Sequence, residues 1–274
     1  MNKTFYFLIV CILMSLRMPL IAQTFDYNQV KAHPRLLMKQ GDEQMVRKSL
    51  QNHPEMQRVY KQLVQEADRL LLCPTLTYQK EGRRLLAVSR EALKRIFYLS
   101  FVYRITEEDK YRLRAEQEMV AVCSFDNWNP SHFLDVGEMT MAVTIGYDWL
   151  YNKLTPKTRK LVRESILQKG FEPSYDKRYN WFLKAANNWN QVCNAGLVYG
   201  AIALLDTDYK QSVDVIERAM SSVPLSMKVY APDGNYPEGY NYWGYGTSFN
   251  VLLIAALESA FDSDGGLSQA EGFM

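Results

Sequence analysis

The sequence predicts an all-α protein whose helical hairpins curl into a closed or nearly closed α/α ring. Apolar residues recur at intervals of three and four along most of the chain, which is the pattern of helices with one buried face. No stretch alternates convincingly between polar and apolar residues as a strand does. Short breaks such as "LDTDY" and "YNKLTP" join consecutive helices, and short connections make neighbouring helices antiparallel.

The helical pattern divides into segments in chain order. These are residues 53–72, 91–105, 109–123, 132–151, 156–170, 192–205, 212–227 and 248–261. Helix starts are marked by Ser131, by Thr155 before a proline, and by the region of Asn188. Allowing for gaps in the pattern, we expect about nine helices. No repeat of fixed length is visible, which argues against a solenoid.

The first 22 residues have the pattern of a secretory signal peptide. Lys3 precedes the apolar stretch "FYFLIVCILMSL", and the small residue Ala22 comes just before the polar sequence. We therefore expect residues 1–22 to be removed and residues 23–274 to form one α/α domain that is periplasmic or secreted. A lipid anchor at Cys11 is disfavoured, because "LIVC" lacks the small residue expected before a lipidated cysteine.

Composition disfavours several function classes. The formal net charge is +2, and no block of lysine and arginine offers a track for nucleic acid or for an anionic membrane. No membrane span is expected after signal removal. Cys73, Cys123 and Cys193 are odd in number and lack CxxC spacing, so we favour three buried free thiols over one disulfide. No zinc site, other metal site or cofactor is evident.

Three polar and aromatic segments stand at the starts of alternate helices. They are "NWNPSHFLDVGEM", "AANNWNQVCNAG" and "GNYPEGYNYWGYG". If neighbouring helices are antiparallel, alternate helices are parallel, and these three starts lie at the same end of the bundle. Helix amino ends carry unpaired N–H groups and partial positive charge, which favour anionic ligands. An acidic sugar is the ligand that fits such an end lined with Trp, Tyr and Asn.

His132 and three clustered asparagines are the first candidate site residues. His132 stands in the first turn of its helix with Asp135 three residues later, where a helix end favours the neutral imidazole and prepares it to accept a proton. A surface histidine that caps its own turn is the alternative interpretation. Of Asn187, Asn188 and Asn190, one is expected as the helix cap. The others exceed what capping needs, and their amides can bind a uronate carboxylate.

Five tyrosines between Tyr230 and Tyr245 make the last of these segments unusual. Tyr242, Tyr245 and Phe249 share one helical face, with Glu238 one turn before Tyr242. An aromatic core stripe is the alternative, but the glycines among these residues weaken a helix and leave room for a ligand. We therefore expect this face to bind a ligand.

Four pieces of the chain together resemble the N-terminal helical region of heparinase II/III-like polysaccharide lyases, a group that includes related alginate lyases. The pieces are "HPRLLM", "SHFLDVGEMTMAVTIGYDWLY", "NNWNQVCNAGLVYGAIAL" and "PDGNYPEGYNYWGYGTSF", in that order. The resemblance implies an (α/α) toroid, normally followed by a β-sandwich domain. No such domain follows here, so we expect an incomplete toroid that is truncated at its C-terminal end. The implied activity is β-elimination on a polysaccharide that contains uronic acid, heparin-like or alginate-like.

The resemblance also implies roles for individual residues. Tyr242 matches the tyrosine that serves as acid and often as base, and Asn188 matches the asparagine that neutralises the substrate carboxylate. The family commonly has histidine after that asparagine, whereas this chain has Trp189, so His132 or a residue of the missing region supplies the imidazole. The missing region could also carry a metal. The remaining substrate-binding candidates are Trp189, Asn190, Glu238, Tyr240, Trp243 and Tyr245.

Two other functions stay open from the sequence. An α/α-barrel glycoside hydrolase would use a pair of carboxylates, for which Asp135, Glu138, Asp148, Asp233 and Glu238 are available. A non-catalytic exported protein that binds glycans is the second alternative.

Overall fold

The computed structural model describes residues 25–273, and this part of the chain is helical throughout its regular structure. It contains no β-strand, and its one β-bridge joins Glu81 to Arg84. The predicted all-α class is therefore confirmed. The predicted signal peptide, residues 1–22, and its Cys11 lie outside the described residues. Within residues 25–273, no helix combines the length and the apolar character needed to cross a membrane.

Ten α-helices lie in the described part, close to the number expected. They are α2 (Asp42–Asn52), α3 (Pro54–Leu71), α4 (Leu86–Thr106), α5 (Asp109–Cys123), α6 (Phe133–Leu150), α7 (Pro156–Ser165), α8 (Glu172–Tyr175), α9 (Asn188–Leu204), α10 (Tyr209–Met227) and α11 (Tyr240–Phe261). Shorter turns connect them, including the 3-10 helices η2 (Pro130–His132) and η4 (Asn180–Lys184) and the π-helical turn η3 (Ile166–Phe171).

The predicted segments each contain a helix, with differences at the boundaries. Thr155 caps α7 as expected, since its hydroxyl accepts a hydrogen bond from the backbone N–H of Thr158 at 3.1 Å. Ser131 does not cap α6, because the chain makes the 3-10 turn η2 first. Helices α2 and α8 were not predicted from the sequence. Helices α9 and α11 begin earlier than predicted, so the polar segments before them form their first turns.

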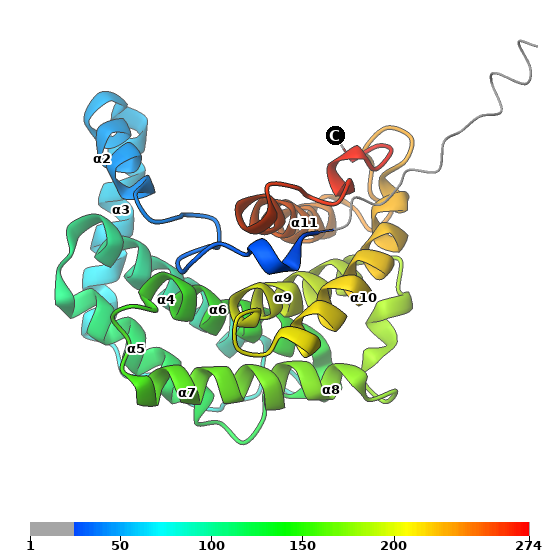
Figure 1. Ribbon diagram of the computed structural model, residues 1–274, viewed down its shortest axis with the longest axis horizontal. Coiled ribbons are helices and arrows are strands. Elements are labelled where there is room, and N and C mark those ends of the chain that lie inside the picture. The colour runs from blue at the N-terminus through cyan, green and yellow to red at the C-terminus, as the bar shows by residue number, and fades with distance from the viewer. Residues whose placement is uncertain (1–24, 274) are drawn as a thin grey trace, which may run out of the picture.

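The helices form two rows, which can be followed in Figure 1. Helices α4, α6, α9 and α11 contact one another in that order and make up the inner row, while α5 packs on α4 and α10 packs on α9 in the outer row. Inner helices therefore alternate in sequence with outer ones, and the four inner helices run in the same direction. This is the arrangement of stacked hairpins that the sequence predicted. Closure of the rows into a toroid stays a prediction.

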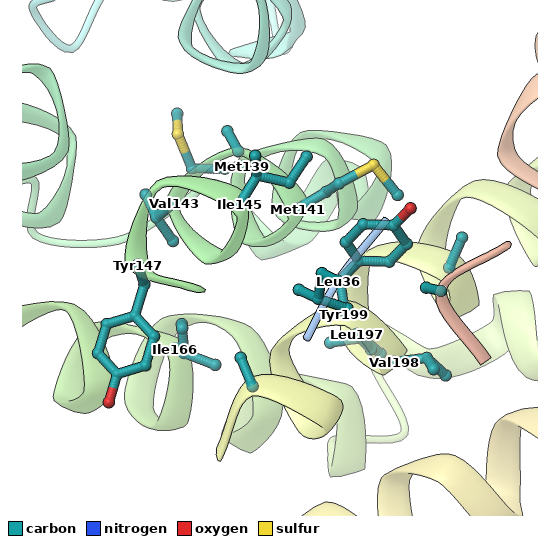
Figure 2. Close-up of a cluster of buried hydrophobic side chains, with 14 of the residues drawn as sticks. Leu36, Met139, Met141, Val143, Ile145, Tyr147, Ile166, Leu197, Val198 and Tyr199 are labelled. Atoms are coloured by element: carbon teal, nitrogen blue, oxygen red, sulfur yellow. The ribbon is translucent and has the colours of Figure 1, made fainter. Parts of the chain in front are cut away.

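The core lies around α6 and α9. All 18 residues of α6 are buried, including the carboxylates of Asp135, Glu138 and Asp148, each of which bonds to other protein groups. Figure 2 shows side chains of α6 packed with those of α9, of η3 and of the N-terminal arm. The labelled residues are Leu36, Met139, Met141, Val143, Ile145, Tyr147, Ile166, Leu197, Val198 and Tyr199.

Two glycines let α6 and α9 approach each other closely. A Cβ atom added at Gly196 would lie 2.0 Å from the carbonyl oxygen of Gly137, and one added at Gly137 would lie 3.0 Å from the Cα of Cys193. Only a residue without a side chain fits such a contact between two backbones. The amino ends of these two helices are therefore held near each other.

The N-terminal arm crosses the opposite end of the inner helices. Asp148, fully buried near the end of α6, bonds to His33 Nδ1 at 2.6 Å and accepts the backbone N–H groups of Arg35 and Leu36, both at 2.9 Å. The "HPRLLM" segment therefore anchors the N-terminal arm to the end of α6.

The same arm contacts the first and the last inner helix. The Ser259 hydroxyl of α11 donates to the carbonyl of Arg35 at 2.8 Å, and Arg104 of α4 donates to the carbonyl of Lys39 at 2.8 Å. The arm thus ties α4, α6 and α11 together at their carboxyl ends.

The cysteines of the described residues are all free. Cys123 and Cys193 are buried as expected, whereas Cys73 is only partly buried. Residues 25–273 contain no group of three or more His, Cys, Asp or Glu side chains that could hold a metal ion.

Candidate functional site at the amino ends of the inner helices

A polar cavity of about 490 Å³ lies where the amino ends of the four inner helices meet. Helices α4, α6, α9 and α11 each contribute lining residues from their first two turns or from the one or two residues just before them. The lining consists of Arg84, Leu86, Arg90, His132, Leu134, Asn188, Trp189, Asn241, Tyr242 and Tyr245. The three segments expected to converge at one end do converge, and the start of α4 joins them.

His132 is held by Asp135 at the edge of this cavity. Its Nδ1 lies 2.6 Å from Asp135 Oδ1, and Asp135 Oδ2 accepts the backbone N–H of Leu85 at 2.7 Å and the amide of Asn129 at 2.6 Å. An acceptor of this kind takes the Nδ1–H of the neutral imidazole and leaves Nε2 as a proton acceptor. His132 is only 4% exposed, so the alternative of a surface histidine is wrong.

Asn188 carries a buried amide that faces the cavity without a partner. The residue is 3% exposed, and its side chain has no hydrogen bond within residues 25–273. The cap of α9 is Asn187, whose side chain accepts the backbone N–H of Trp189 at 3.1 Å. The amide of Asn188 is thereby left for a ligand, because no protein group uses it and the residue lines the cavity.

Asn190 does not belong to the cavity, contrary to the prediction that it binds substrate. It is fully buried, and its amide nitrogen donates to the carbonyl of Phe182 at 3.1 Å and to the hydroxyl of Ser222 at 2.7 Å. Its amide oxygen accepts the hydroxyl of Ser226 at 2.9 Å. With these bonds made, Asn190 fixes the turn η4 against α9 and α10 and has nothing left for a ligand.

Tyr242 and Tyr245 both line the cavity, but their surroundings differ. Tyr242 is 49% exposed, and its hydroxyl has no partner in the described part of the chain. Tyr245 donates its hydroxyl to Glu138 Oε1, and the guanidinium of Arg90 lies 4.9 Å from the centre of its ring. Burial and the carboxylate of Glu138 raise the pKa of the Tyr245 phenol well above its ordinary value. Tyr242 is therefore the more available proton carrier.

Glu138 lies just beneath the cavity, between Tyr245 and Arg90. The side chain is 2% exposed, and its Oε1 also accepts the Nε–H of Arg90 at 3.2 Å. Burial raises the pKa of the Glu138 carboxyl, and the bonds from Tyr245 and the charge of Arg90 offset this only in part. Glu138 therefore offsets part of the positive charge that Arg90 brings to the cavity.

Three predicted substrate-binding residues of the last segment lie outside the cavity, so the structure does not support that assignment. Tyr240 is 82% exposed at the start of α11, and Trp243 donates its indole N–H to the carbonyl of Gly234 at 3.0 Å. Glu238 is exposed in the turn before α11. None of these three residues is among the lining side chains. Trp189 does line the cavity, as predicted.

Arg84, Arg90 and Asn241 are the polar cavity residues that sequence reasoning missed. The two arginines flank the start of α4 in the segment "RRLLAVSR", which has no aromatic or amide cluster to draw attention to it. Their guanidinium groups, the imidazole and four helix amino ends all favour a negatively charged ligand. No carboxylate is among the lining residues that the structure describes.

A second cavity of about 360 Å³ lies at the other end, beside the N-terminal arm. Four of its charged side chains pair with one another, since Arg104 bonds to Glu43 at 2.8 Å and Arg47 bonds to Glu107 at 2.9 Å. The cavity at the amino ends is the better candidate, because four helix amino ends converge there beside an imidazole held by a carboxylate.

No known protein-family model matches the chain, and no curated protein matches it significantly. The resemblance to heparinase II/III-like lyases therefore stays a prediction.

Proposed function

We propose that the protein is a polysaccharide lyase that binds a uronate unit in this cavity and cleaves its glycosidic bond by β-elimination. The observation that carries the proposal is the lining itself. It combines a free buried amide, two guanidinium groups, an exposed phenol and a carboxylate-held imidazole, with no carboxylate among the described lining residues. The segments that resemble the lyases, residues 131–151, 187–204 and 232–249, supply most of these groups.

The first chemical requirement is to mask the charge of the substrate carboxylate. The proton on carbon 5 of a uronate is barely acidic, because its removal places further negative charge beside a carboxylate. Asn188 can donate an amide N–H to that carboxylate, and Arg84 and Arg90 can add charged donors. The four helix amino ends add to this, each by about 0.3–1 kcal/mol.

The second requirement is transfer of two protons. We assign Nε2 of His132 as the base that takes the proton from carbon 5, with Asp135 stabilising the imidazolium that forms. The C4–O4 bond then breaks, a double bond forms between carbons 4 and 5, and O4 takes the proton of Tyr242. Exchange with solvent then removes the proton from His132 and restores the proton of Tyr242.

A glycoside hydrolase is less well supported by the same geometry. Hydrolysis requires two carboxyl groups that flank the glycosidic bond. Asp135 and Glu138 are buried and bonded to protein groups, and Glu238 lies outside the cavity. Export from the cytoplasm, proposed from residues 1–22, would bring the protein to polysaccharides of the type required.

Incubation with alginate and with heparan sulfate tests the proposal. A lyase generates a product with a conjugated double bond that absorbs in the ultraviolet, whereas a hydrolase generates new reducing ends without that absorbance. We expect Tyr242→Phe to lower the turnover number at least about 100-fold, as for loss of a general acid, while substrate binding stays within a factor of two to three. The matched control is Tyr240→Phe, which removes an exposed phenol outside the cavity and should change neither quantity.

Two results would contradict the proposal. Reducing ends without ultraviolet absorbance would indicate hydrolysis. Binding of both polymers without any cleavage, unchanged in Tyr242→Phe, would indicate a glycan-binding protein.

A further inference from the structure

We propose that Trp181 forms a second sugar-binding surface beside the cavity, so that the substrate is a chain that extends over the rim and not an isolated terminal sugar. The inference rests on the proposed function, because it takes the cavity as the place where one uronate unit is held. Trp181 belongs to the 3-10 helix η4 and is not itself a lining residue.

The first observation is a continuous row of rings that leads out of the cavity. The imidazole of His132 meets the ring of Trp189 edge to face, with 4.8 Å between ring centroids. Trp189 in turn packs against Trp181, with 4.7 Å between centroids and an angle of 40° between planes. The row therefore runs from the proposed base, through a lining residue, to a ring on the outer surface.

The second observation is that this outer ring is exposed although its support is rigid. Trp181 is 48% exposed, whereas the next residue, Phe182, is fully buried against the ring of Phe133. The carbonyl of Phe182 accepts the amide of Asn190 at 3.1 Å, which fixes the helix that carries Trp181.

A neighbouring bond secures the same turn. The hydroxyl of Ser222 on α10 donates to the carbonyl of Leu183 at 2.7 Å. These bonds hold η4 at two adjacent residues, Phe182 and Leu183, so the tryptophan before them is presented in a fixed position. A large apolar ring exposed on a fixed turn beside a polar cavity is what a binding surface requires.

The indole ring of Trp181 is suited to binding a sugar. A pyranose has faces of C–H groups and edges of hydroxyls, so it can stack on an indole while its hydroxyls stay in water. Arg84, Arg90 and Asn188 provide the charged and amide groups inside the cavity, whereas Trp181 provides an uncharged face outside it. The inner site therefore selects the uronate carboxylate, and the outer surface adds affinity for an adjoining sugar of either charge.

Such a surface contributes to binding and not to the chemical step. Loss of uniform binding raises KM and leaves kcat unchanged. The effect should also depend on chain length, since a disaccharide held in the cavity is too short to exploit a surface beyond it.

The test uses Trp181→Ala with alginate disaccharide and alginate hexasaccharide. Binding is measured by calorimetry in proteins that also carry Tyr242→Phe, so that no substrate is consumed. We expect the Kd of the hexasaccharide to rise about tenfold and the Kd of the disaccharide to stay unchanged. The control is Tyr209→Ala, which removes a comparably exposed ring at the start of α10, and the melting temperature of both variants verifies folding.

Equal weakening for both lengths would overturn the inference, because Trp181 would then act only by supporting Trp189. No change for either length would overturn it as well. Failure of the lyase proposal is distinguishable: the wild-type protein would then form no ultraviolet-absorbing product, while the length-dependent effect of Trp181 on hexasaccharide binding would persist.

Discussion

At the scale of single residues, the site separates groups that are already bonded from groups that are free. Asp135 and Glu138 have protein partners, whereas the amide of Asn188 and the hydroxyl of Tyr242 have none within residues 25–273. The amide of Asn188 opens into the cavity and is therefore available to a ligand. The bonded groups orient the site, and the free groups are left for substrate.

Glu138 offers a residue-scale prediction, because its charge opposes that of Arg90. Burial raises the pKa of Glu138, so the carboxyl ionises at a higher pH than an ordinary glutamate. As the pH rises through that pKa, the new negative charge offsets Arg90, and the Kd for alginate oligosaccharides should rise. In Glu138→Gln this rise should disappear, and the Kd at a pH above the pKa of Glu138 should be roughly three- to tenfold lower than in the wild type, as for removal of a partly screened charge.

The substitution keeps the shape of the site, since a glutamine oxygen still accepts the Tyr245 hydroxyl. Binding measured from pH 5 to pH 8 checks the prediction. Glu238→Gln, the same change at an exposed position outside the cavity, is the matched control. A Glu138→Gln profile that parallels the wild-type profile would show that the charge of Glu138 does not reach the ligand.

At the scale of elements, the sequence predicts which helix starts meet but not which residue of each start lines the cavity. The common end follows from the alternation of inner and outer helices. The lining residues follow from the rotation of each helix, which changes by about 100° for every residue by which its start is displaced. Because α11 starts at Tyr240 after Gly239 with φ at 83°, Tyr242 and Tyr245 line the cavity and Tyr240 projects into solvent.

Long-range contacts explain the other differences between sequence and structure. The bonds of Asn190 to α10 use up its amide, and nothing in "NNWN" distinguishes it from Asn188. Arg90 enters the site because α4 packs beside α6 and its guanidinium reaches Glu138 and Tyr245. Periodicity along one helix carries no information about such partners on another.

The contact between α6 and α9 yields an element-scale prediction. Gly196→Ala places a Cβ 2.0 Å from the backbone oxygen of Gly137, so the two helices must move apart. We expect the free energy of unfolding to fall by about 1–3 kcal/mol, the usual cost of overpacking. Turnover should fall as well, because His132 on one helix and Asn188 on the other would be displaced relative to each other.

Denaturant unfolding and ultraviolet product formation measure the two effects. Gly244→Ala is the control, because a Cβ at that helical position meets no atom within 4 Å. It should leave stability unchanged or raise it by about 0.5–1 kcal/mol, since alanine is the better helix former. Equal stability of the two variants would show that the helices can separate without cost.

At the scale of the whole molecule, the two ends of the inner helices have different tasks. The amino ends hold the cavity, and the carboxyl ends are tied by the N-terminal arm through Asp148, Ser259 and Arg104. An 18-residue helix such as α6 separates these ends by about 27 Å. Changes at the arm should therefore affect stability and leave the chemistry of the cavity intact.

Asp148→Asn tests this division of tasks. Replacing this buried carboxylate leaves His33 without its charged partner and should lower the free energy of unfolding by about 3 kcal/mol, while kcat below the melting temperature stays at the wild-type value. The control is Asp262→Asn in the same region, where Asp262 is 75% exposed and pairs with Lys31 of the arm at 2.5 Å. Loss of such a surface pair should cost no more than about 1 kcal/mol.

The pH dependence of stability sharpens the same test. Burial alone lowers the pKa of His33, but the carboxylates of Asp148 and Asp206 outweigh it and raise the pKa above its ordinary value. Protonated His33 therefore stabilises the wild-type fold below pH about 6.5, and this contribution is lost as the pH rises through the raised pKa. Urea unfolding from pH 5 to pH 9 should show this decline in the wild type and a smaller decline in Asp148→Asn. Identical slopes in the two proteins would mean that the arm is held without the charge of His33, and a lowered kcat in Asp148→Asn would mean that the two ends of the helices are coupled.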